Sequence, residues 1–196
     1  GLDGVLRLRN VFARIAERGA RTWYLGPRSV LRNPFADESS RPARRRPFGP
    51  VATLARRLVR SVRAHRRGER GYVFCYTTEP DHTAHRAGTT GEATAEAIRR
   101  LDRSLERAAQ RLRGSGATIL LTADHGLVDT PVHHWLDKDP EVYRSLLIPP
   151  FPEARFQLYH LTPARRSAFP EAMEKYRSTF LLLPREELLA RGLLGN

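Results

Sequence analysis

The sequence predicts an α/β protein built on a parallel sheet, and two observations carry that prediction. Strand-like and helix-like segments alternate along most of the 196 residues. Two short apolar runs, 71–77 and 117–122, flank a long segment whose apolar residues follow helical spacing. A strand, a helix and a second strand in that order form a βαβ unit, whose right-handed crossover makes the two strands parallel.

The first elements follow from apolar spacing and turn residues. A helix is expected over 5–19, where apolar residues recur at helical spacing. A short strand over 21–25 follows it. The residues 28–50 contain four prolines and many polar side chains, so they are expected to form a long, flexible, Pro/Arg-rich surface loop. A second helix is expected over 51–67.

The βαβ unit comes next in the chain. The run 71–77 contains β-branched and aromatic residues and is expected to be a buried strand. Thr89 and Glu92 form a capping-box pattern that begins a long helix, whose apolar stripe continues to Leu112. The run 117–122 is expected to be a second buried strand.

Beyond residue 139 the elements are shorter and continue to alternate. Pro163 and Pro184 suit the first turn of a helix. The expected elements are, in order, a helix over 139–147, a strand over 155–161, a helix over 163–177, a strand over 179–183 and a helix over 184–191.

Composition limits the classes of protein to which the chain can belong. Forty per cent of the residues are hydrophobic, which is enough for a packed core, and one cysteine excludes an internal disulfide and a Cys-rich zinc module. No apolar run approaches the roughly 20 residues of a membrane span, and no signal peptide is visible. A single unpaired cysteine fits a cytoplasmic protein, although a missing upstream segment would carry any signal peptide with it.

Arginine supplies nearly all of the positive charge. The chain has 34 Lys+Arg against 21 Asp+Glu, a net charge of +13, which favours a polyanionic partner or an anionic substrate steered to a site. The arginines are spread along the chain, and no helix-turn-helix, zinc-finger or RNA-recognition signature accompanies them. Nucleic acid is therefore not the expected partner, and a solvated basic surface explains most of the charge.

Two Asp-His clusters follow the two strands expected in the βαβ unit. Asp81 and His85 come after the first strand, and Asp124 and His125 come after the second. Because parallel sheets bind ligands outside the carboxyl ends of their strands, both clusters are expected at one edge of the sheet. Carboxylate oxygen and neutral imidazole nitrogen suit zinc, manganese or iron ions. Two such clusters side by side favour a two-metal site that clamps a phosphoryl group.

The same residues carry a resemblance to a known family. Asp81, His85 and Gly88 match an Asp-x-x-x-His motif followed by glycine, and residues 122–126 match a Thr-Ala-Asp-His-Gly motif. At these positions the sequence resembles the alkaline phosphatase superfamily, and most closely its type I phosphodiesterase/nucleotide pyrophosphatase branch. The resemblance implies that residues 1–138 are part of a metallo-phosphohydrolase core and that 139–196 form a small α/β insertion.

The resemblance also implies roles for individual residues. Asp81 and His85 would ligate one ion, and Asp124 and His125 the other, with zinc as the usual metal and manganese as the alternative. The substrate would be a small phosphoester, cleaved through a covalent intermediate on a Thr or Ser nucleophile.

Two functional parts of the family's site have no counterpart in this sequence. The nucleophile and the third ligand of the first ion, a histidine, have no match here and are expected outside the chain. The chain begins at Gly1 and its only methionine is Met173, which fits a piece of a longer protein. We therefore expect the whole protein to be a two-metal phosphoric ester hydrolase and this chain to be inactive alone. The alternatives are a metal-dependent phosphomutase of the same superfamily and a non-catalytic basic module that binds nucleic acid.

Overall fold

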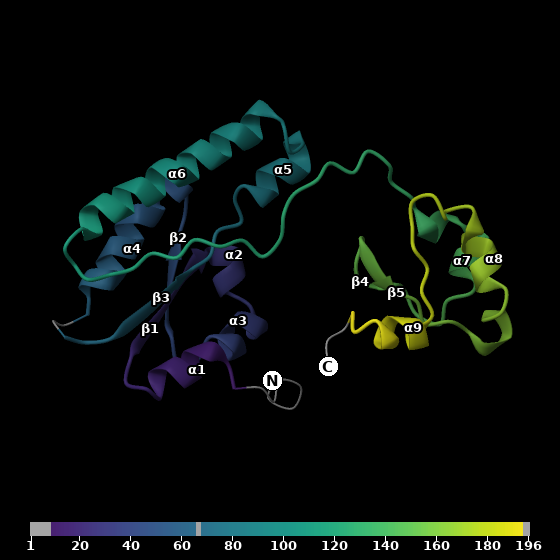
Figure 1. Ribbon diagram of the computed structural model, residues 1–196, viewed down its shortest axis with the longest axis horizontal. Coiled ribbons are helices and arrows are strands. Elements are labelled where there is room, and N and C mark those ends of the chain that lie inside the picture. Colours follow the sequence, from purple (N-terminus) through teal and green to yellow (C-terminus); the bar gives the residue numbers. More distant parts are fainter. Residues whose placement is uncertain (1–8, 66–67, 194–196) are drawn as a thin grey trace. The chain divides into compact units, whose positions relative to one another are not determined.

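The computed structural model describes residues 9–65 and 68–193, and the chain divides into two compact units, residues 1–129 and 130–196. The first unit is built on a three-stranded parallel sheet (Figure 1). Its strands, in the spatial order β2-β1-β3, are β1 (Arg21–Pro27), β2 (Arg44–Phe48) and β3 (Gly71–Cys75). The predicted α/β class with a parallel sheet is confirmed.

Helices cover both faces of this sheet. The helices of the first unit are α1 (Val11–Ala16), α2 (Arg28–Leu31), α3 (Pro34–Ser39), α4 (Leu54–Arg63), α5 (Asp81–Ala87) and α6 (Glu92–Leu112), with a 3-10 turn over Val51–Thr53 before α4. Figure 1 shows α4 and α6 on one side of the sheet and α1 on the other. Of the predicted helices over 5–19 and 51–67, residues 5–8 and 66–67 lie outside the described residues.

The core of the unit lies between the sheet and the α4–α6 layer. Leu25 of the central strand is fully buried and packs with Leu58 of α4 and Ala108 of α6. Side chains alternate between the two faces of the sheet along each strand. On the face opposite this core they are aromatic. There Phe12 of α1 stacks on Tyr24 with ring centroids 5.8 Å apart.

A buried hydroxyl links the two helices of the α4–α6 layer. Ser104 of α6 donates a hydrogen bond to the carbonyl of Val51 (3.0 Å) and accepts one from the backbone N–H of Ala55 (3.3 Å). Thr53, at the N-cap position of α4, donates its own hydroxyl to the Pro50 carbonyl and makes no cap bond. Since the first N–H groups of a helix have no partner within it, Ser104 caps α4 from a distance.

The expectation of a loop over 28–50 is wrong. This segment contains α2, α3 and β2, and β2 pairs in parallel with β1. Asn33 begins α3 by accepting a hydrogen bond from the N–H of Ala36 (2.7 Å), and Pro34 stands in the first turn. Two of the four prolines that indicated a loop therefore lie in regular elements: Pro34 is in the first turn of α3, and Pro47 is in the edge strand β2.

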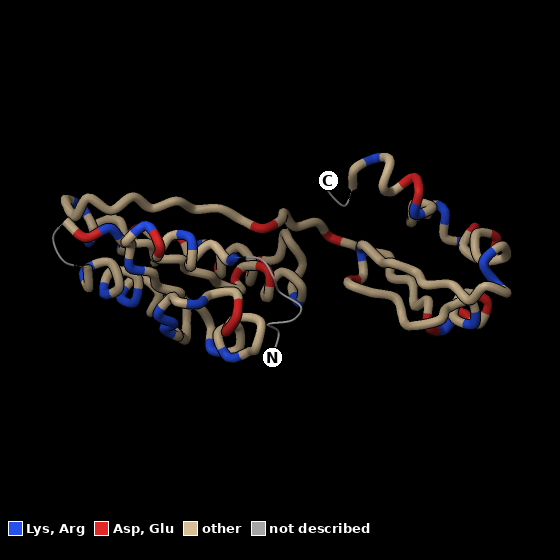
Figure 2. Tube along the Cα trace, turned by 90° about the horizontal axis from the view of Figure 1, so that it is seen from below, with Lys and Arg blue, Asp and Glu red and all other residues tan. Residues whose placement is uncertain are grey.

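The expectation of a buried strand over 117–122 is also wrong. This segment has no regular secondary structure, and Ile119, Leu120 and Leu121 are 39%, 90% and 74% exposed. The segment has strand-like composition but pairs with no neighbour in the described structure. Figure 2 shows it as part of a long trace with few charges along the first unit. The predicted capping box is wrong as well, because Gly91, and not Thr89, is the N-cap of α6.

The second unit combines short helices with a two-stranded antiparallel sheet. Its elements are a 3-10 turn over Leu136–Lys138, α7 (Pro140–Tyr143), β4 (Phe151–Glu153), β5 (Phe156–Leu158), a 3-10 turn over Pro163–Arg165, α8 (Phe169–Glu174) and α9 (Arg185–Ala190). The predicted helices are present in shortened form, and 179–183 is not a strand. The strand β4 was not among the expected elements, and it has Pro152, a residue that is rare within strands, at its centre.

Asp139 organises the core of the second unit. Leu136, Val142, Phe169 and Met173 form that core. The Asp139 carboxylate caps α7 by accepting a hydrogen bond from the N–H of Glu141 (3.1 Å), and it also pairs with Lys175 (2.6 Å) and accepts a hydrogen bond from Tyr176 (2.7 Å). These contacts, first of all the one with Lys175, lower the pKa of Asp139 to about 2.

No helix within the described ranges is both long and apolar enough to cross a lipid bilayer.

Candidate metal centre

The first pair of predicted ligands lies on α5, directly after the carboxyl end of β3. Asp81 is the first residue of α5, and His85 follows one turn later on the same face of the helix. The His85 Nε2 atom is 3.4 Å from Asp81 Oδ1. The structure therefore brings these two predicted ligands together through local helix geometry.

The Asp81 carboxylate has an unusual surrounding for an anion. Its Oδ1 atom is buried and has no hydrogen-bond partner among the described residues, although the side chain as a whole is 41% exposed. A buried carboxylate oxygen without a partner is costly, because it has lost water and gained no donor. A cation between this oxygen and the His85 imidazole would remove that cost, so the pair fits a metal ion.

The turn between β3 and α5 is held by two hydrogen bonds. The N–H of Glu79 donates to the Thr77 hydroxyl (3.1 Å), and the Thr83 hydroxyl donates to Glu79 Oε2 (2.6 Å). Thr83 is in the first turn of α5, so these bonds fix where the helix begins. They therefore set the direction in which Asp81 is presented.

The second pair of predicted ligands is about as exposed as the first, in which the Asp81 and His85 side chains are 41% and 74% exposed. Asp124 and His125 lie in the segment without secondary structure, with side-chain exposures of 70% and 40%. His125 Nδ1 is 2.8 Å from the Gly126 carbonyl, which can only accept, so Nδ1 carries the proton. In this orientation His125 Nε2 lies 3.9 Å from Asp124 Oδ1. A neutral imidazole with its proton on Nδ1 is the form that binds a metal ion through Nε2.

One contact ties the segment of the second pair to the loop after the first pair. Asp129 accepts hydrogen bonds from the Thr89 N–H (2.7 Å) and the Thr89 hydroxyl (2.9 Å). These bonds, and the backbone one most, lower the pKa of Asp129. Thr89 follows His85 by four residues and Asp129 follows His125 by four, so the contact holds both motifs at one end of the unit.

The four predicted ligands do not form a single cluster. Over residues 9–65 and 68–193, no three His, Cys, Asp or Glu side chains come together where they could hold one ion. The structure thus forms each Asp-His pair and leaves the two pairs separate. The Asp129–Thr89 contact was missed by the sequence analysis, because the pattern of Thr89 and Glu92 indicated a helix cap.

Gly88 directly precedes Thr89, which bonds to Asp129. It ends α5 with a φ of +78°, a conformation that other residues rarely adopt. A side chain there would also approach Asp129 Oδ1 to 3.5 Å. The glycine of the first motif is thus explained by backbone geometry in this structure.

Comparison with known proteins identifies the family. A family model described as type I phosphodiesterase / nucleotide pyrophosphatase matches residues 14–182, a range that includes both Asp-His pairs. Comparison with curated proteins and with solved structures gives no match. Since the match covers most of the chain, the chain belongs to the type I phosphodiesterase/nucleotide pyrophosphatase family of the alkaline phosphatase superfamily.

Proposed function

We propose that the chain is the metal-binding part of a two-metal phosphoric ester hydrolase that cleaves phosphodiester or pyrophosphate bonds. Membership in the family supports the reaction class. The single observation that carries the metal assignment is the buried, unpartnered Oδ1 of Asp81 beside His85 Nε2. Such an oxygen is what a cation site offers before the cation binds.

Each Asp-His pair is assigned one ion. Asp81 and His85 would hold the first, and Asp124 and His125 the second, with zinc as the expected metal and manganese as the alternative. When bound, such ions activate an oxygen nucleophile and neutralise charge on the phosphoryl group. Around them, the hydrogen bond from His125 Nδ1 to Gly126 keeps Nε2 available, and the Thr83–Glu79 bond orients α5.

The number of donors limits what this chain does alone. Zinc sites in proteins normally have three or four protein ligands, and each ion is assigned two here. The proposal therefore includes further ligands and a Thr or Ser nucleophile from outside this chain, and it makes the isolated chain a weak metal binder without turnover.

The experiment is a zinc titration of the full chain, followed by calorimetry and by competition with a chromogenic chelator. Asp81→Asn removes one charge from the first pair and should abolish the tighter binding event. The matched control is Asp102→Asn, which removes an exposed carboxylate on α6 and should leave the titration unchanged.

Two outcomes would contradict the proposal in different ways. Absence of zinc and manganese binding, or equal binding by Asp81→Asn and the native chain, would overturn the metal assignment. Robust, chelator-sensitive hydrolysis of a nitrophenyl phosphodiester by the chain alone would overturn the claim that the site is incomplete.

A further inference from the structure

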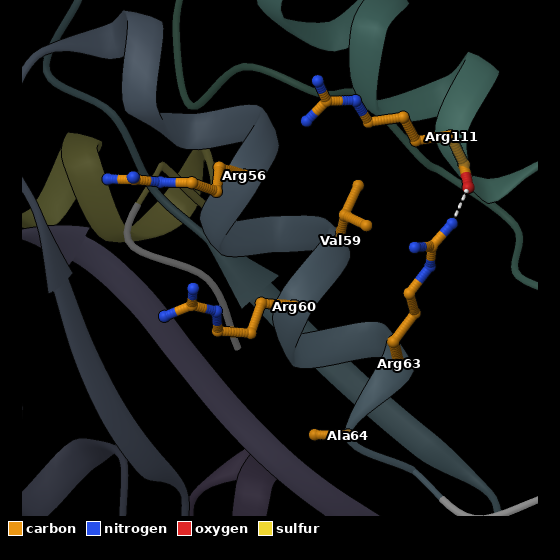
Figure 3. A pocket seen from close by; sticks show the side chains of 6 residues that line it. All are labelled: Arg56, Val59, Arg60, Arg63, Ala64 and Arg111. Atoms are coloured by element: carbon orange, nitrogen blue, oxygen red, sulfur yellow. Dashed lines mark hydrogen bonds between the residues drawn. The ribbon is translucent and has the colours of Figure 1, made fainter.

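An open surface groove of about 620 Å³ in the first unit is lined by four exposed arginines and by no acidic residue. We call it the arginine groove, and its lining residues are Arg56, Val59, Arg60, Arg63, Ala64 and Arg111 (Figure 3). Arg56, Arg60 and Arg63 follow helical spacing along one face of α4. Arg111 comes from the last turn of α6.

Some arginines of the same unit pair with acidic side chains, and the four arginines of the groove pair with none among the described residues. On α6, the Glu96 carboxylate forms ion pairs with Arg99, Arg100 and Arg103. In the described part of the chain, none of the four arginines of the groove forms a salt bridge. Arg56, Arg60 and Arg63 are spaced four and three residues apart on α4, and like charges at that spacing repel, so a bound anion would offset an electrostatic cost.

The groove has a partly fixed geometry. The Arg63 guanidinium donates a hydrogen bond to the Arg111 carbonyl (2.9 Å), which holds one cation at the rim (Figure 3). Val59 forms the floor and is only 7% exposed. A guanidinium that is already positioned loses less entropy on binding, and its planar fork matches two phosphate oxygens.

The size and charge of the groove indicate the class of ligand. Ligand cavities in proteins span roughly 300–1,000 Å³, and the groove falls within that range. Four cations exceed what one orthophosphate can neutralise, whereas a chain of two or three phosphates carries three to four negative charges. We propose that the arginine groove is a second anion site, which binds a di- or triphosphate group.

This site is separate from the candidate metal centre. Arg111 lies 19 residues after Glu92, the first residue of α6, and a helix rises about 1.5 Å per residue, so the two are roughly 30 Å apart along α6. Helix α5, which carries Asp81, contacts α6, and the chain enters α6 directly from it. The inference therefore does not depend on the proposed hydrolase activity.

The test is a calorimetric titration of the full chain with inorganic tripolyphosphate in the presence of EDTA, so that no metal ion contributes. The double variant Arg60→Gln/Arg63→Gln should weaken binding about tenfold or more. The matched control is Arg165→Gln/Arg166→Gln, which removes the same charge from exposed positions of the second unit and should leave the affinity unchanged. Circular dichroism of both variants checks that they are folded.

Titrations with ATP and with an oligonucleotide distinguish the possible ligands, and several results would contradict the proposal. Binding of ATP with an affinity equal to or above that of tripolyphosphate supports the proposal and extends it to nucleotides. The proposal is overturned if the native chain shows no saturable binding, or if both double variants weaken binding equally. It is also overturned if a mixed-sequence single-stranded oligonucleotide binds and tripolyphosphate does not, since that result would indicate a nucleic-acid surface.

Discussion

Ser104→Ala is expected to destabilise the first unit, because this hydroxyl supplies the N-terminal cap of another helix. In the native chain Ser104 is 2% exposed and bonds to both Val51 and Ala55. Alanine removes both hydrogen bonds without adding volume. The Ala55 N–H then remains buried with no acceptor, since Thr53 is committed to the Pro50 carbonyl.

The magnitude follows from that unpaired group. Leaving a buried donor unsatisfied costs about 1–3 kcal/mol, so we expect a loss of about 2 kcal/mol. For a unit of this size, such a loss lowers Tm by roughly 8 °C. It should also speed hydrogen exchange at the Ala55 amide by about thirtyfold, if exchange there occurs through opening of this cap.

Two measurements distinguish the loss of the Ser104 cap from a general loss of stability. Thermal unfolding followed by circular dichroism gives the change in Tm, and amide exchange followed by NMR gives the local effect at Ala55. Ser29→Ala, at an exposed position of α2, is the control and should stay within about 0.5 kcal/mol of the native chain. If Ser104→Ala matched that control in both measurements, the assignment of a distant cap would be refuted.

Three further predictions concern single side chains. Because its folded pKa of about 2 is below the unfolded value of 3.8, Asp139 stabilises the second unit above about pH 4, and this contribution is lost as the pH falls towards 2. Acid unfolding followed by NMR should therefore begin at higher pH in Asp139→Asn, and coincident curves would contradict this. Asp129→Asn weakens the hydrogen bonds from Thr89, so limited proteolysis within 114–128 should become faster than in the native chain. An unchanged rate would show that these hydrogen bonds do not hold the segment in place. Burial raises the pKa of Cys75 to about 12 from 9.0, so its reaction with a disulfide reagent at pH 8 should be about a thousandfold slower than in the denatured chain, and a rate equal to that of a free thiol would refute the burial.

The sequence predicts those elements whose signals are local. The apolar stripe of α6 and the β-branched run of β3 each indicate an element within a single window of residues. The Asp81–His85 pair is predictable for the same reason, because one helical turn brings the residues together. The strand β2 has no such signal. Arg44 and Arg46 stack over the ring of Trp23 on β1, at 5.6 and 4.6 Å from its centroid, and this long-range contact stabilises a strand that its own composition does not favour.

The segment 117–122 shows the opposite error. Its composition favours a strand, yet a strand is stabilised by hydrogen bonds to a neighbour, and composition does not determine whether a neighbour is present. The Thr89–Asp129 contact was equally hidden, because it joins residues 40 positions apart through a polar pair that has a simpler local interpretation. In both the fold and the site, the sequence therefore did not predict the contacts between residues that are far apart in the chain.

These differences in local order have a consequence for the proposed metal centre. Asp81 and His85 are held on a helix whose start is fixed by Thr83 and Glu79, so little backbone entropy is lost when they bind an ion. Asp124 and His125 lie on an exposed segment, and within the described residues its long-range hydrogen bonds are those between Asp129 and Thr89. An ion at the second pair must therefore order the backbone as well as bind, and part of its binding free energy offsets that cost. Under the proposed function, the α5 pair is the preformed site and is filled first, and the second site is assembled around its ion.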